Sequence, residues 1–384
     1  MFRRVVVGGG LSLMLLWNAA CDSGGGGGGG GDDSITADSP APPDVGGMET
    51  AGDLPLGTDE GGPAADVPVG PVDGKWETVG AALEPAGLVT DLVVDGDKIY
   101  ASVAVDGNKE KLFFLDGPGG AWSEVTGLQI PEGNSGTIPL ALVDGNVVAG
   151  MPPGYSEADK KIFVRPAGKA EFEVRTVGFI NNDAGLADLF VGDGSVYGLA
   201  FDGVVADELV TSTDAGDTWT VSKNDGLITS GACFGFASGK RNFYAGDGML
   251  HYCDAGGASC TDVPKTSVPG AVAGDGDGTN VVVIAKGAAF DFYLSADNGA
   301  TWSKSDKVLP ATGSVALRFG NGCFFVAAKM DIIRSCDGGA TWESVKDGAP
   351  MSGAFVDNPP QVLFATSKHL HGFFGTQLYR LAIQ

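Results

Sequence analysis

The chain has 384 residues, 63 of them glycine, and a formal charge of −24. Proteins bind nucleic acids and anionic lipid headgroups largely through Lys and Arg, so we do not expect this chain to bind either one. Glycine at this level without a three-residue period excludes collagen and indicates many turns. The charge is uneven: residues 22–73 contain eleven acidic and no basic residues, and the chain after them holds 22 basic and 37 acidic residues.

The first twenty residues have the pattern of an export signal. Arg3 and Arg4 precede an apolar stretch over residues 5–17, and small residues follow it. Thirteen residues are too few to cross a bilayer as a helix, so we predict a signal peptide over residues 1–20.

The end of this signal, Ala19-Ala20-Cys21, resembles the lipobox of bacterial lipoproteins. That motif usually has Leu where this chain has Asn18, and the alternative is ordinary cleavage after Ala20 that leaves a free thiol. The resemblance implies a lipid on Cys21. It also implies a protein anchored at the outer membrane or cell surface rather than at the inner membrane.

Residues 21–73 form a Gly-, Asp- and Pro-rich segment that begins with eight consecutive glycines at 24–31. The segment has too little apolar surface to build a core, so we predict a disordered acidic tether. The folded domain is expected to comprise residues 74–384.

A pattern S-x-D-x-G-x-T-W occurs at residues 212–219, 295–302 and 335–342. An Asp carboxylate can accept backbone N–H groups inside a tight turn, Gly allows a positive φ, and Thr and Trp favour the start of a strand. The residues concerned are Asp214, Gly216 and Trp219; Asp297, Gly299 and Trp302; and Asp337, Gly339 and Trp342.

This pattern resembles the Asp-box, or BNR repeat, of sialidase-like and sortilin-like β-propellers. The resemblance implies a turn between the third and fourth strands of a blade, away from any ligand. Degenerate copies extend the series, and the anchor residues lie 40 to 50 residues apart, which is the length of a four-stranded blade. The anchors are Trp76, Trp122, Phe172, Trp219, Cys260, Trp302 and Trp342.

We therefore predict an all-β fold, a β-propeller with seven four-stranded blades, with six or eight blades as alternatives. The last blade has a third strand near Tyr379 and no fourth strand after it, whereas residues 75–79 read as a fourth strand with no blade before them. Pairing these two segments would close the ring and leave no open sheet edge.

Five cysteines follow Cys21, and disulfides are permitted in an exported protein. We predict one disulfide between Cys253 and Cys260, which bracket a degenerate repeat, and one between Cys323 and Cys336, which lie opposite each other in a hairpin. Cys233 is then left over and is expected to be a buried, small apolar residue.

The sialidase resemblance extends only in part to the residues that such enzymes use. It implies three arginines, a Tyr–Glu pair, an Asp acid/base and an F-R-I-P-like motif. Of six arginines after the signal, only Arg318 is predicted on a first, channel-lining strand. Phe163-Val-Arg-Pro166 resembles the motif but falls on a third strand of the second blade. No catalytic pair can be chosen among the 37 acidic residues.

Signals for metals and cofactors are weak. His369 and His371 would share one face of a strand, but two ligands make only half a metal site, and a surface pair is the simpler interpretation. The acidic segment 274–278 lacks the ligand spacing of a calcium loop. No catalytic residue, metal ligand or cofactor is assigned.

The hypothesis from sequence is a monomeric, lipid-anchored, non-enzymatic binding or scaffold propeller. Its partner would be a protein, peptide or glycan, and the membrane would be contacted through the lipid. The alternative is an exo-acting glycoside hydrolase of the sialidase type at the cell surface.

Overall fold

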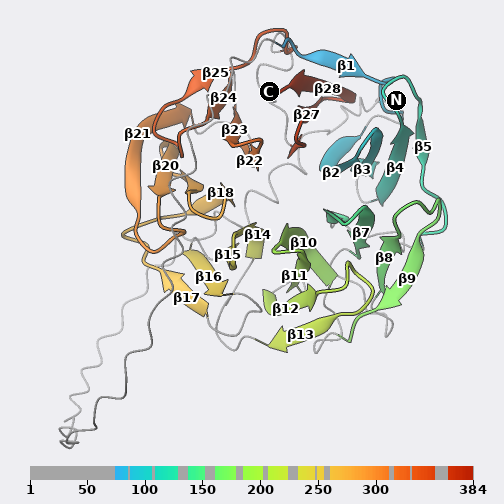
Figure 1. Ribbon diagram of the computed structural model, residues 1–384, viewed down its shortest axis with the longest axis horizontal. Coiled ribbons are helices and arrows are strands. Elements are labelled where there is room, and N and C mark those ends of the chain that lie inside the picture. Colours follow the sequence, from blue (N-terminus) through green and yellow to red (C-terminus); the bar gives the residue numbers. More distant parts are fainter. Residues whose placement is uncertain are drawn as a thin grey trace, which may run out of the picture.

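The computed structural model describes residues 74–84, 87–105, 109–128, 137–151, 161–178, 185–201, 206–223, 232–246, 249–254, 260–310, 315–328, 331–350 and 362–383. Within these ranges every regular element is a β-strand, so there is no helix that could cross a membrane. The strands form seven four-stranded antiparallel sheets arranged as blades around a centre, which confirms the predicted β-propeller (Figure 1).

Each of blades 1 to 6 uses four consecutive strands, numbered outward from the centre. Blade 1 contains β2 (Leu88–Asp95), β3 (Lys98–Val105), β4 (Lys109–Asp116) and β5 (Trp122–Glu124). Blade 2 contains β6 (Leu140–Val143), β7 (Asn146–Gly150), β8 (Lys161–Arg165) and β9 (Glu173–Thr176). Blade 3 contains β10 (Gly185–Gly192), β11 (Ser195–Phe201), β12 (Ala206–Ser212) and β13 (Thr220–Lys223). Blade 4 contains β14 (Ala232–Ser238), β15 (Arg241–Gly246), β16 (Met249–Asp254) and β17 (Cys260–Val263). Blade 5 contains β18 (Ala271–Gly276), β19 (Val281–Lys286), β20 (Ala289–Ser295) and β21 (Ser303–Pro310). Blade 6 contains β22 (Ala316–Gly320), β23 (Cys323–Ala328), β24 (Asp331–Ser335) and β25 (Glu343–Ser344).

Blade 7 joins the two ends of the domain. It contains β26 (Leu363–Ala365), β27 (His369–Phe374) and β28 (Gln377–Ala382), and its outermost strand is β1 (Glu77–Val79). Thr78 pairs with Tyr379 in the antiparallel register. The predicted closure is confirmed, and it removes two open sheet edges at once.

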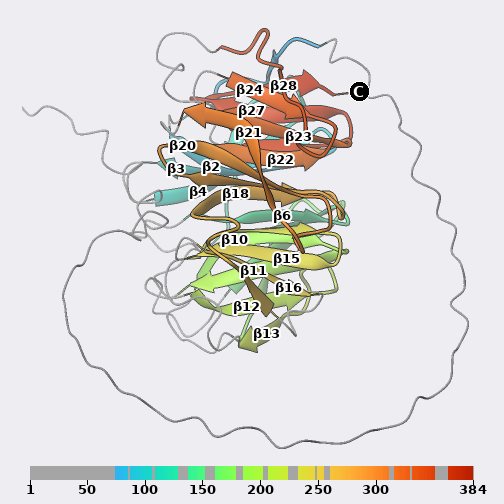
Figure 2. The same cartoon turned by 90° about the vertical axis from the view of Figure 1, so that its left-hand side faces the viewer.

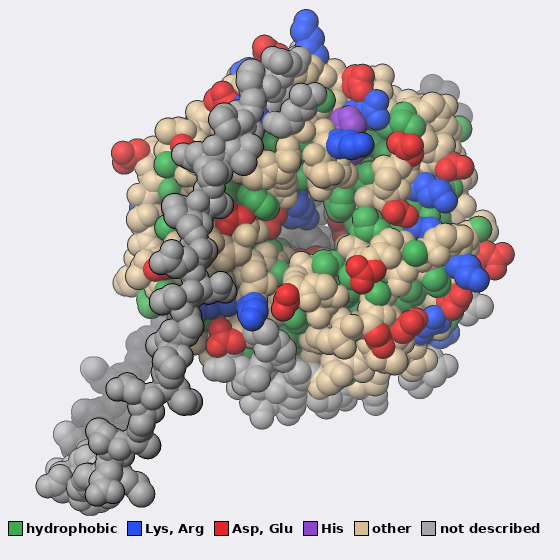
Figure 3. All heavy atoms as spheres, in the orientation of Figure 1, with side chains coloured by type: hydrophobic (Ala, Val, Ile, Leu, Met, Phe, Trp, Pro, Cys, Tyr) green, Lys and Arg blue, Asp and Glu red, His purple; other side chains and the backbone are tan. Residues whose placement is uncertain are grey.

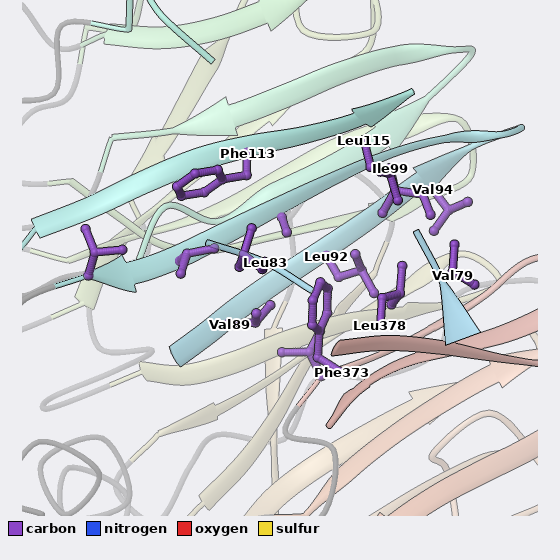
Figure 4. Close-up of a cluster of buried hydrophobic side chains, with 14 residues drawn as sticks. Val79, Leu83, Val89, Leu92, Val94, Ile99, Phe113, Leu115, Phe373 and Leu378 are labelled. Atoms are coloured by element: carbon purple, nitrogen blue, oxygen red, sulfur yellow. The ribbon is translucent and has the colours of Figure 1, made fainter. Parts of the chain in front are cut away.

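The hydrophobic core lies between neighbouring blades, which stack face to face in the side view (Figure 2). Between blades 7 and 1, for example, Phe373 and Leu378 pack with Leu92 and Val94 (Figure 4). Because every blade is covered on both faces by its neighbours, its middle strands read as continuous apolar runs. The run Cys323–Ala328 is buried along its whole length.

Candidate functional site

The seven innermost strands contact one another in a ring, in the order β2, β6, β10, β14, β18, β22, β26 and back to β2. The space-filling view shows the molecule hollowed at the centre of this ring, with acidic and basic side chains at its rim (Figure 3). Four ionisable side chains on the innermost strands interact electrostatically and define the site that we call the channel cluster: Asp91 on β2, Asp188 on β10, Asp275 on β18 and Arg318 on β22.

Each carboxylate of the channel cluster links two blades. One oxygen accepts the N–H of the following residue, and the other accepts a backbone N–H from the innermost strand of the next blade. An innermost strand has one unpaired edge, so its free amides need such acceptors. The interblade pairs are Asp91 with Leu140 (2.6 Å), Asp188 with Gly235 (2.7 Å) and Asp275 with Phe319 (2.7 Å).

Burial raises the pKa of all three carboxyl groups despite these hydrogen bonds. The pKa rises to about 6 for Asp91 and Asp275 and to about 7 for Asp188, where the charge of Asp91 adds to the effect. The positive charge of Arg318 acts in the opposite direction on all three. The channel cluster therefore changes its protonation close to neutral pH.

A polar chain leads from the channel cluster into blade 1. Thr90 is an extra, bulged residue on β2, between two residues that pair with β3. Its hydroxyl donates to Ser102 Oγ (3.0 Å), which donates to Glu110 Oε2 (3.1 Å). Burial raises the pKa of Glu110 to about 8, with the charge of Asp91 contributing, so Glu110 holds its proton at neutral pH.

The fold does not require this polar chain. Blade 5 has the same bulge on β18, and its residues pair in the same register. Val272 occupies the position of Thr90, and Ala273 occupies that of Asp91. Ile284 occupies the position of Ser102, and Phe290 occupies that of Glu110. The four replacements belong to an apolar cluster. Polar groups are thus a property of blade 1 rather than of the blade architecture.

The arginines do not gather as a sialidase-type site requires. Arg318 alone lies on an innermost strand, as predicted, and the other five pair with carboxylates on other strands or turns. Those pairs are Arg165–Asp95, Arg175–Asp217, Arg241–Asp254, Arg334–Glu343 and Arg380–Glu77. Phe163 to Arg165 belong to β8, the third strand of the second blade.

The three S-x-D-x-G-x-T-W turns share one hydrogen-bond set between the third and fourth strands. In blade 5, Ser295 Oγ donates to Asp297 Oδ1 and accepts from Gly299 N, and the same carboxylate accepts Thr301 N and Oγ1. Asp214 and Asp337 make the same contacts.

The glycine of each turn sits against the preceding blade. The φ angles of Gly216, Gly299 and Gly339 are 98°, 86° and 94°. A Cβ on Gly299 would lie 2.7 Å from Phe243 in blade 4, and Trp302 packs against the same ring. These turns therefore hold neighbouring blades together and do not reach the channel cluster.

Both predicted disulfides are present, Cys253–Cys260 and Cys323–Cys336. Cys253 and Cys260 are directly opposed in β16 and β17, whereas Cys336 directly follows the end of β24. Cys233 lies in β14, but its side chain lies outside the described residues. The signal, Cys21 and the tether also lie outside them.

The histidine pair differs from expectation in one respect. The rings of His369 and His371 lie 5.9 Å apart, but His371 is buried, so the interpretation as a surface pair is wrong for this residue. Burial lowers its pKa to about 3, which keeps it neutral. No metal-binding group of three ligands occurs among the described residues.

Neither a protein-family model nor a curated protein sequence matches the chain. Solved structures match in fold. Virginiamycin B lyase from Staphylococcus aureus aligns with 13% identity and a TM-score of 0.59 over 81% of this chain and 100% of that one. YCF48 bound to a D1 peptide aligns with 13% identity and a TM-score of 0.55 over 80% and 97%.

The extracellular domain of the putative hybrid two component system BT4673 from B. thetaiotaomicron is also similar. It aligns with 12% identity and a TM-score of 0.56 over 80% of this chain and 40% of that one. At these identities the likeness concerns the propeller fold alone.

Sequence reasoning found Arg318 but missed the three carboxylates. A signal existed for two of them: Asp91-Leu92 and Asp188-Leu189 both precede a hairpin turn by the same distance, within an innermost strand that is mostly apolar. The two acids occupy equivalent positions when the repeats are aligned by their hairpin turns. Asp275 lies in the acidic segment 274–278, which lacks the spacing of a calcium loop, and the neighbouring Asp277 caps the turn there.

Proposed function

We propose that this chain is an exported, non-enzymatic binding protein whose ligand enters the central channel. The observation that carries the proposal is the channel cluster: an arginine and three carboxyl groups face one channel, and no ion pair within 4.0 Å joins Arg318 to any described carboxylate. Charged groups on concave, partly desolvated walls favour ligand recognition. The partner is a protein, peptide or glycan.

Location at the cell envelope is part of the same proposal. Two disulfides fit an oxidising compartment. The signal-like start and Cys21 fit a lipid anchor, with the acidic tether as a spacer. Replacing Cys21→Ala should move the protein from the membrane fraction to the soluble fraction. A variant that stays with the membranes would contradict the anchor.

Ligand binding can be tested with the purified full chain against a glycan array and a peptide display library. Binders of the wild-type protein should lose at least about tenfold in affinity with Arg318→Gln, since a charge-assisted contact contributes about 1.5–3 kcal/mol. Arg380→Gln is the matched control, because Arg380 pairs with Glu77 on outer strands. Ligands that bind both variants as well as wild type would place the site elsewhere.

A glycoside hydrolase remains the second candidate, and one observation favours it. The pKa values of Glu110 (about 8) and Asp188 (about 7) lie where a general acid would need them. Hydrolysis of sialyllactose or nitrophenyl glycosides, abolished by Glu110→Gln or Asp188→Asn, would establish this activity and end the non-enzymatic proposal.

A further inference from the structure

Arg318 differs from every other arginine after the signal. The other five each have a carboxylate oxygen within 4.0 Å. Arg318 is exposed in the channel, and among the described residues its one hydrogen bond runs from Nη1 to the carbonyl of Leu317 (3.1 Å). A guanidinium has five N–H donors in a planar fork that matches a carboxylate, so most of its donors face the channel unused.

The opposite wall carries unused negative charge. Among the seven innermost strands, β6 and β10 are furthest from β22 around the ring, and β10 carries Asp188. Asp91 lies on β2, on the way from β22 to β10, and acts electrostatically on Asp188. Each carboxylate accepts two backbone N–H groups, but neither has a Lys or Arg within 4.0 Å among the described residues. A carboxylate can accept about four hydrogen bonds, so capacity remains.

These opposite charges cannot satisfy each other directly. The ring of innermost strands holds β22 and β10 apart, and the blade-to-blade hydrogen bonds of Asp91 and Asp188 fix the carboxylates in place. A purely anionic ligand at Arg318 would face three carboxyl groups, and a purely cationic ligand at Asp188 would face the guanidinium. A ligand with both charges, separated along its length, matches both walls.

We propose that the channel binds a zwitterionic ligand, a short peptide with free termini, whose carboxylate pairs with Arg318 and whose ammonium group pairs with Asp188 and Asp91. This inference rests on the proposed function and names the chemistry of its ligand. The span of the channel sets the length of the peptide, at about 3.5 Å per extended residue.

The pH dependence of binding follows from the groups that face the ligand. These are Arg318, Asp91, Asp188 and Asp275 on the innermost strands, with Glu110 behind Asp91. The ammonium group needs an ionised Asp188, whose pKa is about 7. Affinity should therefore rise at least about tenfold from pH 5.5 to about pH 7.5, and it should fall above that pH because the terminal amine loses its proton near pH 8.

The test uses glycine peptides, because their only charges are the two termini. Diglycine to pentaglycine are titrated into the full chain by calorimetry, together with the N-acetylated and C-amidated form of each. One length should bind best, and blocking either end should weaken that binding at least about tenfold. Arg318→Gln should remove the preference for a free carboxylate. Asp188→Asn should remove the preference for a free amine.

Matched controls separate ligand contacts from structural roles. Asp277→Asn removes a carboxylate that caps the turn after β18 and does not belong to the channel cluster, so it should leave both preferences intact. Arg380→Gln should change nothing. Thermal melting checks that each variant is folded, since Asp188 also bonds Gly235.

Three outcomes would overturn the inference. If the acetylated peptides bind as well as the free ones, the channel is an anion site. If the amidated peptides bind as tightly as the free ones, the channel is a cation site. If no glycine peptide binds, but a ligand from the display library depends on Arg318, the proposed function stands and the zwitterionic ligand is wrong.

Discussion

Blades 1 and 5 have the same strand order and the same bulge on the innermost strand, yet they differ in what they bury there. Blade 5 places Val272, Ile284 and Phe290 at positions where blade 1 has Thr90, Ser102 and Glu110. The apolar version shows that the architecture closes without polar groups. The polar version places an otherwise costly buried carboxyl group beside the channel, so blade 1 is where specialisation of the site is to be sought.

The largest effect is expected from making blade 5 resemble blade 1. Phe290 is buried in an apolar cluster, so Phe290→Glu loses the packing of the ring and buries a carboxyl group without the hydroxyl partners that Glu110 has. The free energy of unfolding should fall by at least about 3–5 kcal/mol in urea denaturation. Phe290→Leu is the control and should lose less. A loss below about 1 kcal/mol for the glutamate would mean that the two blades are interchangeable here.

Removing the carboxyl group of Glu110 from blade 1 should alter how the stability of the protein depends on pH. The pKa of Glu110 is about 8 in the folded chain and near 4.5 when exposed. The unfolded chain therefore releases this proton first, and the carboxyl group lowers stability as the pH rises from about 4.5 to about 8.

Glu110→Gln removes that slope, so it should stabilise the protein at pH 8 by about 1–3 kcal/mol and have little effect at pH 4. Urea denaturation at the two pH values measures the difference. Asp116→Asn, an exposed residue at the other end of the same strand, is the control. An equal effect of Glu110→Gln at both pH values would show that burial does not raise this pKa.

A smaller difference in stability between blades 5 and 1 is expected when the turns between their third and fourth strands are altered. Blade 5 has the complete turn, with the buried hydroxyl of Ser295 bonded to Asp297 and Gly299, so Ser295→Ala should lose about 1–2 kcal/mol. The degenerate turn of blade 1 begins with Asp116, an exposed side chain, and Asp116→Ala should change stability by less than about 0.5 kcal/mol. Thermal melting compares the two, and similar losses would show that the degenerate turn is held by its acid as well.

An effect smaller than that of Ser295→Ala is expected for Thr90→Val, which copies Val272 of blade 5. The substitution preserves shape, and Ser102 keeps its bond to Glu110, so stability should change by less than about 1 kcal/mol. The measurement is the urea midpoint. A larger loss would show that the polar chain supports blade 1 structurally instead of serving a ligand.

The sequence alone determined the architecture because its signals are local. A Gly with positive φ, an Asp that can cap a turn and a Trp at the next strand recur at blade length, and each works within a few residues of its neighbours. Cys323 and Cys336 were predictable for the same reason, since the register of one hairpin places them opposite each other. The closing strand followed from a missing fourth strand at one end and a surplus one at the other.

The channel cluster depended on the ring as a whole. Asp91, Asp188, Asp275 and Arg318 come from four blades, and no single segment shows which of these charges face one another. A bulge directly before Asp91 and Asp188 sets where these side chains point, and the next blade supplies the amide that each one accepts. Burial raised their pKa values only once the seven innermost strands enclosed them. The sequence thus determined the propeller and favoured seven blades over six or eight, and only the closure of the ring decided the number of blades and which charges face one another.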